Sequence, residues 1–260
     1  MIRFASLGSG SRGNALLVQS GRTRLLIDCG FGPRVLAQRL ARLGVVPEQI
    51  DAVLITHEHS DHVAGVAALA KRYACPVYLS AGTRQALARR QIAVPHLEEI
   101  DPAASFTIHD VEVRPYAVPH DAAEPTQFVL ASDGIRLGVL TDAGSITPAM
   151  LDALRGCNGL MLEFNHDADM LARGPYPEYL KARVGGAYGH LDNGMATDLL
   201  AQLRSDALQV VLAAHLSETN NHPDHVRAHL ARVLAGAPTA WHVASQHDGS
   251  GWLTLGRVHG

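Results

Sequence analysis

The chain has 260 residues, 47% of them hydrophobic, and a formal net charge of −3. This length and apolar content are enough for a sizeable core, and we expect a single domain over residues 1–260. The negative charge excludes a protein that is basic throughout, so any binding of nucleic acid must depend on a local patch.

The first residues, MIRFASLGSGSRGN, lack the continuous apolar segment of a signal peptide, and no later apolar run is long enough to span a bilayer. Cys29, Cys75 and Cys157 are far apart and form no Cys-x-x-Cys pattern, which is typical of reduced thiols. We therefore expect a soluble cytoplasmic protein without a membrane partner. The oligomeric state stays open, and a homodimer is compatible with the sequence.

The first predicted strand covers residues 2–7 and is followed by the turn GSGSRGN, Gly8 to Asn14. Apolar runs at residues 15–18 and 24–27 predict a hairpin. The glycine-rich turn is either a tight turn near a site or a loop that contacts substrate. Because it lacks a lysine of the Walker type, we do not expect it to bind a nucleotide.

A helix is predicted from Pro33, where the missing N–H of proline costs nothing, to Gly44. Its apolar stripe consists of Val35, Leu36, Leu40 and Leu43.

The stretch VLITHEHSDHVAG, residues 53–65, places four potential metal ligands directly after a short β-branched run that predicts a buried strand. Side chains alternate along an extended segment, so His57 and His59 project the same way and can hold one ion. Asp61 and His62 stand where the chain turns into a helix and suit a second ion. Imidazole and carboxylate ligands without cysteine favour zinc, manganese or iron in an open catalytic site.

The sequence THEHSDHVAG resembles the HxHxDH signature of the metallo-β-lactamase fold superfamily. This resemblance implies an α/β (α+β) protein, a four-layer αββα sandwich with a two-metal site at one edge. It also implies that Asp28, which ends a predicted strand, orients a metal-bound histidine. By its position alone, Asp28 could equally be a turn former.

The elements that follow are a helix, a strand at residues 77–79, a helix at about 83–90 and strands within 105–118. Arg84, Arg89 and Arg90 are expected to form a solvated face on the second of these helices, with contact to a polyanionic substrate as the alternative.

His120 follows a strand, as His57 does, and matches the order of ligands in the superfamily. We expect it to complete the first metal site. The sequence TQFVLASDGIRLGVLTD predicts a hairpin with Asp-Gly at its tip. The hairpin ends in Asp142, which matches the superfamily's carboxylate that bridges both metals.

The second half repeats the pattern of a strand followed by a polar loop. Predicted elements are a helix at 146–154, a strand at 160–162, a helix that ends at Leu203, a strand at 210–212, a helix after Pro223 and a strand at 241–244. His215 again follows a strand, so it is the natural last ligand for the second ion.

The motifs EFNHD, GHLDN and HLSETNN, together with the GSGSRGN opening, resemble the YycJ or WalJ subgroup of metallo-β-lactamase fold hydrolases. This subgroup is related to ribonuclease Z and to the phosphodiesterases of carbon–phosphorus lyase systems, and the resemblance covers essentially the whole chain. It implies a phosphodiesterase with two divalent metal ions, zinc or manganese with iron as a further option. It also implies 5′-to-3′ exonuclease activity on nucleic acid, with DNA favoured.

In this interpretation two metals lower the pKa of a bridging water, and the resulting hydroxide attacks phosphorus. The metal ligands are His57, His59, Asp61, His62, His120, Asp142 and His215. His190 is surplus to this set, and with Asp61 it is a catalytic candidate: it could stabilise phosphoryl charge and protonate the leaving 3′ oxygen. Supporting or substrate-contacting roles are expected for Asn14, Asn165 and Ser217.

The motifs between Asp142 and His215 leave no room for a large inserted cap, such as related nucleases have, and residues 170–187 are predicted to form a short loop that faces the substrate. Its cations, Arg173, Lys181 and Arg183, lie among tyrosines and prolines and could contact nucleic acid. The same composition is also typical of an ordinary loop.

Two alternatives remain open. The same centre could hydrolyse a small ester, thioester, lactone, β-lactam or cyclic phosphate, because the ligands do not select the substrate. A metal-binding oxidoreductase or redox scaffold would need a flavin domain or a replaced ligand, and the sequence has neither.

Overall fold

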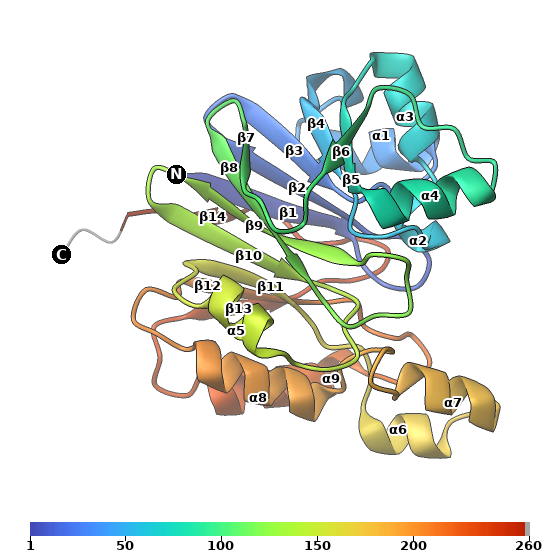
Figure 1. Ribbon diagram of the computed structural model, residues 1–260. Helices are drawn as coiled ribbons and strands as arrows, with labels where there is room; N and C mark the ends of the chain where they lie inside the picture. Colours follow the sequence, from blue (N-terminus) through green and yellow to red (C-terminus); the bar gives the residue numbers. More distant parts are fainter. Residues whose placement is uncertain (258–260) are drawn as a thin grey trace.

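The computed structural model describes residues 1–257. Two seven-stranded sheets lie face to face, and helices cover both outer faces, which gives four layers in the order αββα (Figure 1). The predicted fold class is confirmed.

The first sheet combines an antiparallel N-terminal part with a parallel part. Its strands, in spatial order, are β14 (Leu253–Leu255), β1 (Ile2–Gly8), β2 (Ala15–Ser20), β3 (Thr23–Ile27), β4 (Ala52–Leu54), β5 (Val77–Ser80) and β6 (Leu97–Ile100). Pairing is antiparallel from β14 to β3 and parallel from β3 to β6.

The second sheet is built in the same way. Its strands, in spatial order, are β13 (Ala240–Val243), β12 (Val210–Ala214), β11 (Gly159–Glu163), β10 (Ile135–Leu140), β9 (Thr126–Ser132), β8 (Val111–Ala117) and β7 (Phe106–Ile108). Pairing is antiparallel from β7 to β10 and parallel from β10 to β13.

Helices lie on the outer faces of the sheets and at one end of the sandwich. The first sheet carries α1 (Pro33–Arg42), the 3₁₀ helix η1 (Pro47–Gln49), α2 (Ser60–Val63), α3 (Val66–Tyr73) and α4 (Ala81–Arg89). The second sheet carries α5 (Pro148–Leu154), α8 (Asn193–Leu203) and α9 (Pro223–Val233). The pair α6 (Ala168–Arg173) and α7 (Glu178–Val184) projects from the body instead (Figure 1).

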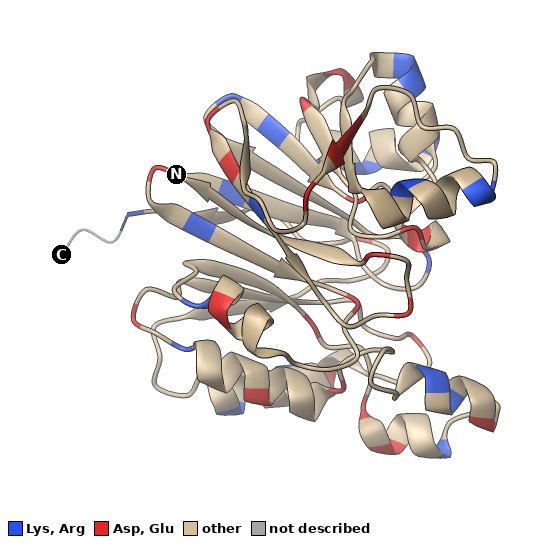
Figure 2. Ribbon diagram, in the orientation of Figure 1, with Lys and Arg blue, Asp and Glu red and all other residues tan. Residues whose placement is uncertain are grey.

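Three apolar layers hold the sandwich together. Phe4 and Phe128 are fully buried in the layer between the sheets, and each contributes roughly 2–3 kcal/mol by leaving water. Leu36 and Leu40 of α1 belong to the layer outside the first sheet, and Leu200 of α8 to the layer outside the second. Charged residues lie mainly on the helices and loops around this core (Figure 2).

Strand direction decides where the polar loops meet. Strands β1, β3 and β4 run in one direction in the first sheet, as β8, β10, β11 and β12 do in the second. The loops that follow these strands therefore gather at one edge of the sandwich, as the resemblance to the metallo-β-lactamase superfamily implies.

Local sequence signals explain several element boundaries. Pro33 opens α1 at its first position, and Gly44 follows the helix with φ of 71°. Val35, predicted to lie on the apolar stripe of α1, is instead 40% exposed. Asp133 and Gly134 both have positive φ, as the tight β9–β10 turn requires.

The expectation of a loop over residues 170–187 is wrong, because α6 and α7 occupy most of this segment. Asp167 caps α6 by accepting a hydrogen bond from Met170 N, and Lys181 pairs with Glu178 one turn away on α7. The short edge strands β6 and β14 and the 3₁₀ helix η1 were also not predicted.

Cys29, Cys75 and Cys157 are buried free thiols. None of the helices within residues 1–257 combines the length and the apolar character needed to cross a membrane.

Candidate metal centre

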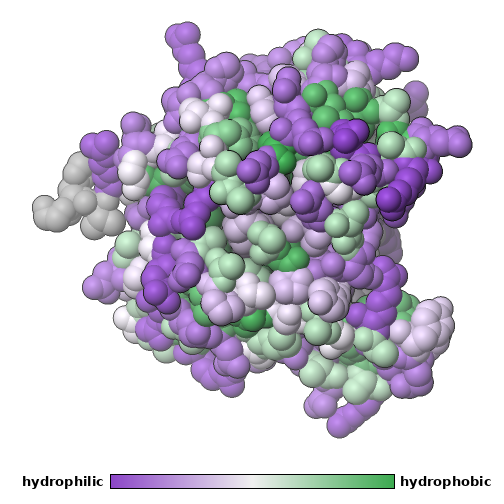
Figure 3. All heavy atoms as spheres, in the orientation of Figure 1, coloured by the Kyte–Doolittle hydropathy of each residue, from purple (hydrophilic) through white to green (hydrophobic). Residues whose placement is uncertain are grey.

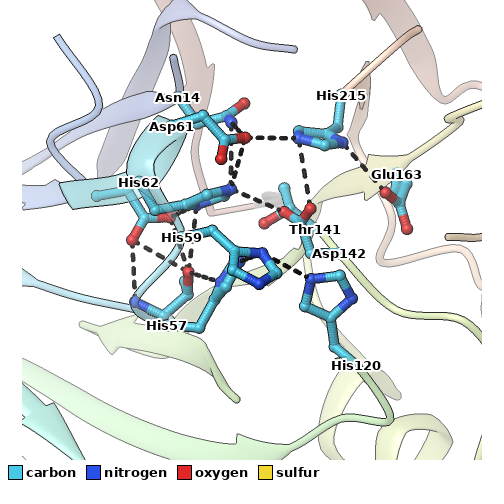
Figure 4. A network of polar contacts seen from close by, with 12 residues as sticks. Asn14, His57, His59, Asp61, His62, His120, Thr141, Asp142, Glu163 and His215 are labelled. Atoms are coloured by element: carbon cyan, nitrogen blue, oxygen red, sulfur yellow. Dashed lines mark hydrogen bonds and ion pairs between the residues drawn. The ribbon is translucent and has the colours of Figure 1, made fainter. Parts of the chain in front are cut away.

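All seven predicted ligands meet at the edge where the strands end (Figure 4). His57 and His59 follow β4, Asp61 and His62 lie on α2, His120 follows β8, Asp142 follows β10 and His215 follows β12. Their assignment as ligands stays a prediction, but the geometry that it requires is present.

Left-handed backbone turns direct three of the polar side chains at this edge. Asp28, Asp142 and His215 each come directly or two residues after a strand, with φ of 61°, 55° and 56°. Such a conformation costs on the order of 1 kcal/mol or more in a residue other than glycine. The surrounding contacts must therefore fix these three turns.

The first group consists of three imidazoles whose nitrogens converge. His59 Nδ1 lies 3.0 Å from His57 Nε2 and 3.3 Å from His120 Nε2. His120 Nδ1 donates to the carbonyl of Gly189 at 3.0 Å, so its Nε2 carries a lone pair toward the group.

The second group joins a carboxylate to two imidazoles. His62 Nε2 lies 3.3 Å and His215 Nε2 3.6 Å from Asp61 Oδ2. The Asp142 carboxylate faces both histidines, with Oδ2 3.2 Å from His62 Nε2 and Oδ1 3.4 Å from His215 Nε2. Because His57, His62 and Asp142 also come together, Asp142 adjoins both groups.

Buried partners orient these histidines from behind. Asp28 Oδ2 accepts a hydrogen bond from His62 Nδ1 at 2.7 Å. The Thr56 hydroxyl donates to Asp28 and therefore accepts from His57 Nδ1 at 2.9 Å. Asn14 reaches the cluster from the glycine-rich turn and donates to Asp61 Oδ2 at 3.1 Å. This turn thus lies against the cluster, and its Ser11 lines the adjoining cavity, so both of its interpretations stay open.

Glu163 is a site residue that sequence reasoning missed. It ends the otherwise apolar strand β11, is fully buried and accepts a hydrogen bond from His190 Nδ1 at 2.8 Å. The same oxygen lies 3.2 Å from His215 Nδ1. A charged residue closing an apolar strand, at the start of the EFNHD motif, was the signal that could have identified it.

His190 lies beside the cluster and lines the adjoining cavity. Its Nδ1 faces Glu163 and lies 3.5 Å from Asp142 Oδ1, so Nε2 is the nitrogen left for other partners. Asp142, Glu163, His190 and His215 bring potential ligand atoms close enough for a metal ion, so a ligand role for His190 is also compatible with the geometry.

Burial lowers the pKa of both His57 and His59. The neighbouring His62 lowers the pKa of His57 further, and His120 does the same for His59. Both imidazoles are therefore neutral near pH 7, which is the form that binds a metal ion.

Charge attraction outweighs burial on the other side of the cluster. Burial opposes the charged form of His215, but Asp142 raises its pKa to about 10. In return, and against burial, His215 and His62 hold the pKa of Asp142 well below its usual range. Burial opposes the charged form of Glu163, but His190 stabilises it and the pKa of this carboxylate is lowered to about 2. Burial likewise opposes the charged form of His190, but Glu163 outweighs it and raises the pKa of this imidazole.

The donor set fits divalent cations. Asp142 Oδ2 and His215 Nε2 are buried and have no hydrogen-bond partner within residues 1–257. Such orphaned atoms are costly unless a further group satisfies them. Two nitrogens bound to one zinc ion at about 2.0–2.1 Å in tetrahedral geometry stand roughly 3.3 Å apart, close to the spacing in the first imidazole group.

An open cavity of about 310 Å³ adjoins the cluster. His59, Asp61, Asp142, His190 and His215 line it together with Ser11, Ser60, Arg90, Asp121, Arg183, Val184 and Gly189. Arg183 Nε pairs with Asp121 at 2.6 Å, and Arg90 Nη1 donates to the carbonyl of Glu58 at 2.8 Å. The cavity therefore combines a potential metal centre with two guanidinium groups.

The remaining predicted residues are only partly brought to this site. Asn165 Nδ2 donates to the carbonyl of His215 at 3.0 Å and so supports that turn. Ser217 does not line the cavity, and its hydroxyl accepts from Asn220 N instead. Arg183 lines the cavity, whereas Arg173 and Lys181 do not; Lys181 bonds to Ala172 O and Glu178.

Comparison with known proteins identifies the relatives of this chain. The family model for the beta-lactamase superfamily domain matches residues 23–216. The exodeoxyribonuclease YycJ of Bacillus anthracis is 32% identical over 235 residues, which are 90% of this chain and 89% of that protein. The exodeoxyribonuclease WalJ of Streptococcus pneumoniae is 30% identical over 241 residues, again 90% and 89% of the two chains.

A solved structure shares the whole fold. The metallo-beta-lactamase fold protein YhfI from Bacillus subtilis superposes with a TM-score of 0.76 over 98% of this chain and 100% of that one. The two sequences are 18% identical, so this likeness concerns the fold alone.

Proposed function

The chain belongs to the beta-lactamase superfamily, in its nuclease and phosphodiesterase branch, and from this premise we propose that it is a two-metal 5′-to-3′ exonuclease that acts on DNA. As a member of this family it is a metal-dependent hydrolase. The 5′-to-3′ direction rests on the resemblance to the YycJ group. We also propose a cytoplasmic location, which agrees with the free thiols.

The observation that carries the proposal is the position of His190. It lines the cavity beside the cluster, Glu163 holds its Nδ1, and Arg90 and Arg183 line the same cavity. A protonated imidazole and two guanidinium groups beside a metal centre match the negative charge of a phosphodiester. An ester, lactone or thioester would not require this set of cations.

Two divalent cations fit the donor atoms described above. The first would be held by His57, His59 and His120, the second by Asp61, His62 and His215, and both by Asp142. When bound, they would supply an activated water near neutral pH and neutralise phosphoryl charge.

The chain's own residues perform the remaining tasks. Glu163 accepts a hydrogen bond from His190 Nδ1 and stabilises the charged form of this imidazole, so that Nε2 can give a proton to the leaving 3′ oxygen. Arg183 and Arg90 would hold phosphate groups at the rim of the cavity. Cleavage in this sense releases nucleotides with a 5′ phosphate and a 3′ hydroxyl.

A panel of substrates tests the proposal. DNA and RNA oligonucleotides, single- and double-stranded and labelled at either end, would be incubated with zinc, manganese or iron beside bis-p-nitrophenyl phosphate and a thioester. We expect stepwise release of mononucleotides from the 5′ end of DNA, and none after chelation. Hydrolysis of the thioester without any cleavage of phosphodiesters would reject the proposal.

A further inference from the structure

Two tyrosines in and after α7 are largely exposed to solvent. The most exposed large apolar side chains within residues 1–257 are Tyr179, at 75%, and Tyr188, at 65%. Tyr179 lies on α7 and Tyr188 on the segment that returns from α7 to the cluster. The projecting α6–α7 lobe stands out from the body in the space-filling view (Figure 3).

The backbone at Tyr188 is fixed against the cluster. Its carbonyl accepts a hydrogen bond from Asp121 N at 3.0 Å, and the carbonyl of Gly189 accepts from His120 Nδ1 at 3.0 Å. A Cβ atom at Gly144 would lie 2.3 Å from Gly189 N, so the segment packs closely on its other side. Tyr188 is therefore an exposed ring on a firmly held backbone.

The chain treats a structural tyrosine differently. Tyr116 is 6% exposed, packs in the core outside the second sheet and donates its hydroxyl proton to Val139 O. Tyr188 has no comparable burial, since 65% of its surface is exposed. Single exposed apolar residues are common, so exposure alone proves nothing.

The surroundings indicate which ligand would use the ring. Val184, Gly189 and His190, close to Tyr188 in the chain, line the cavity, and so do Arg90 and Arg183. Within residues 1–257, the Arg183 side chain donates a hydrogen bond through Nε, to Asp121, whereas a guanidinium group has five N–H donors. Tyr188 directly precedes the lining residue Gly189 in the chain. A cavity lined by cations with an exposed aromatic residue on an adjoining segment is a combination that binds single-stranded nucleic acid.

Resting on the proposed function, we propose that Tyr188 is a stacking platform for an unpaired base next to the phosphate held in the cavity. The enzyme then takes a strand end whose bases are free, and a blunt duplex must fray before its end can enter. Stacking on an aromatic side chain is independent of base identity, because every base has a π-face.

The experiment compares Tyr188→Ala, Tyr188→Leu and Tyr188→Phe with the parental protein. Substrates are a single-stranded DNA oligonucleotide, the same strand with abasic sites in its first positions, and bis-p-nitrophenyl phosphate. For Tyr188→Ala and Tyr188→Leu we expect the ratio of kcat/KM for the strand to that for the base-free compound to fall about 10- to 100-fold, mainly through KM. Tyr188→Phe keeps the aromatic face and should keep the parental ratio.

Two controls make the outcome specific. Val46→Ala removes apolar surface that is 49% exposed outside the cavity and should leave the ratio unchanged. On the abasic strand the parental protein and Tyr188→Ala should become equal. A parental ratio in Tyr188→Leu, or an equal loss on the abasic strand, would overturn the inference.

Binding separates this inference from the proposed function. Fluorescence anisotropy of a labelled oligothymidine measures the contact without hydrolysis. If the parental protein cleaves no phosphodiester, the proposed function fails, whereas weaker binding by Tyr188→Ala than by Tyr188→Phe still supports the platform. Equal binding by these two variants contradicts it.

Discussion

Glu163 shows how much one buried carboxylate organises at this site. It accepts hydrogen bonds from Ala143 N, Leu191 N and His190 Nδ1 and lies beside His215 Nδ1. It thereby ties the segment after β10, the His190 loop and a potential metal ligand to the end of β11. The neighbouring motif was recognised in the sequence, but the partners of Glu163 depend on three loops that meet only in the folded chain.

His190→Ala tests the acid role of this histidine. We expect the variant to keep both metals and to lose on the order of 10²–10⁴ in rate on DNA, the usual contribution of one general acid. The loss should be smaller for bis-p-nitrophenyl phosphate, because p-nitrophenolate leaves without a proton. Metal analysis and kinetics on both substrates provide the measurement. Loss of a metal would instead make His190 a ligand, and a parental rate on DNA would make it structural.

Asp142→Asn tests the bridging role of Asp142. Asparagine has nearly the same shape and tolerates the φ of 55° at this position, so the variant removes the charge and little else. We expect loss of bound metal and a fall in activity beyond the roughly 10–100-fold caused by removing an outer-shell partner. Metal content by mass spectrometry and turnover are the measurements.

Asp133→Asn is the matched control for Asp142→Asn. Asp133 also has positive φ, at 53°, but stands exposed at the tip of the β9–β10 hairpin. It should keep parental metal content and activity. Two metals per chain and ordinary turnover in Asp142→Asn would end the bridging hypothesis.

At the scale of elements, the ends of strands were the most predictable part of the site. His57, His120 and His215 each follow a short apolar run, so their common edge could be inferred from the sequence pattern. The α6–α7 segment was not predicted, because Gly174, Pro175 and Pro177 interrupt it and each helix spans fewer than two full turns of recognisable periodicity. Its helices depend on local caps and pairs.

The loop after β3 must pack tightly against the metal-binding segment. A Cβ atom at Gly30 would lie 1.8 Å from Asp61 O, whereas one at Gly32 would meet nothing within 4 Å. We therefore expect Gly30→Ala to lower the free energy of unfolding by about 3 kcal/mol, near the upper end for overpacking, and to reduce metal binding. Gly32→Ala should lower it by only a few tenths of a kcal/mol, since glycine is slightly preferred before a helix.

Urea unfolding and metal titration of both glycine variants measure these effects. Equal stability of Gly30→Ala and Gly32→Ala would show that the loop after β3 can move away from the Asp61 segment without lowering the free energy of unfolding. A stable Gly30→Ala that binds metal normally would mean that the position of Asp61 is not critical.

At the scale of the whole molecule, the sequence predicted the layers better than the charge distribution. Both halves repeat a strand followed by a polar loop, and the two stacked sheets followed from the resemblance of THEHSDHVAG to the metallo-β-lactamase superfamily. The net charge of −3 gave no position for a basic patch. Arg90 and Arg183, far apart in the sequence, line the same cavity. Arg90 directly follows α4 and Arg183 belongs to α7, and these two helices lie at the same side of the sandwich (Figure 1).

Binding of single-stranded DNA should therefore depend on salt through the cavity and not through the whole surface. Each neutralised phosphate on a single strand contributes about −0.7 to the slope of log affinity against log salt. Neutralising Arg90 and Arg183 together, as Arg90→Gln and Arg183→Gln, should reduce the magnitude of the slope by about 1.4. The measurement is anisotropy at several salt concentrations in a His190→Ala background, which slows cleavage.

The matched control neutralises Arg84 and Arg173, exposed cations that do not line the cavity, and should leave the slope unchanged. The reverse pattern would place the binding surface on the outer faces of α4 and α6 and would remove the cavity's cations from the proposed mechanism.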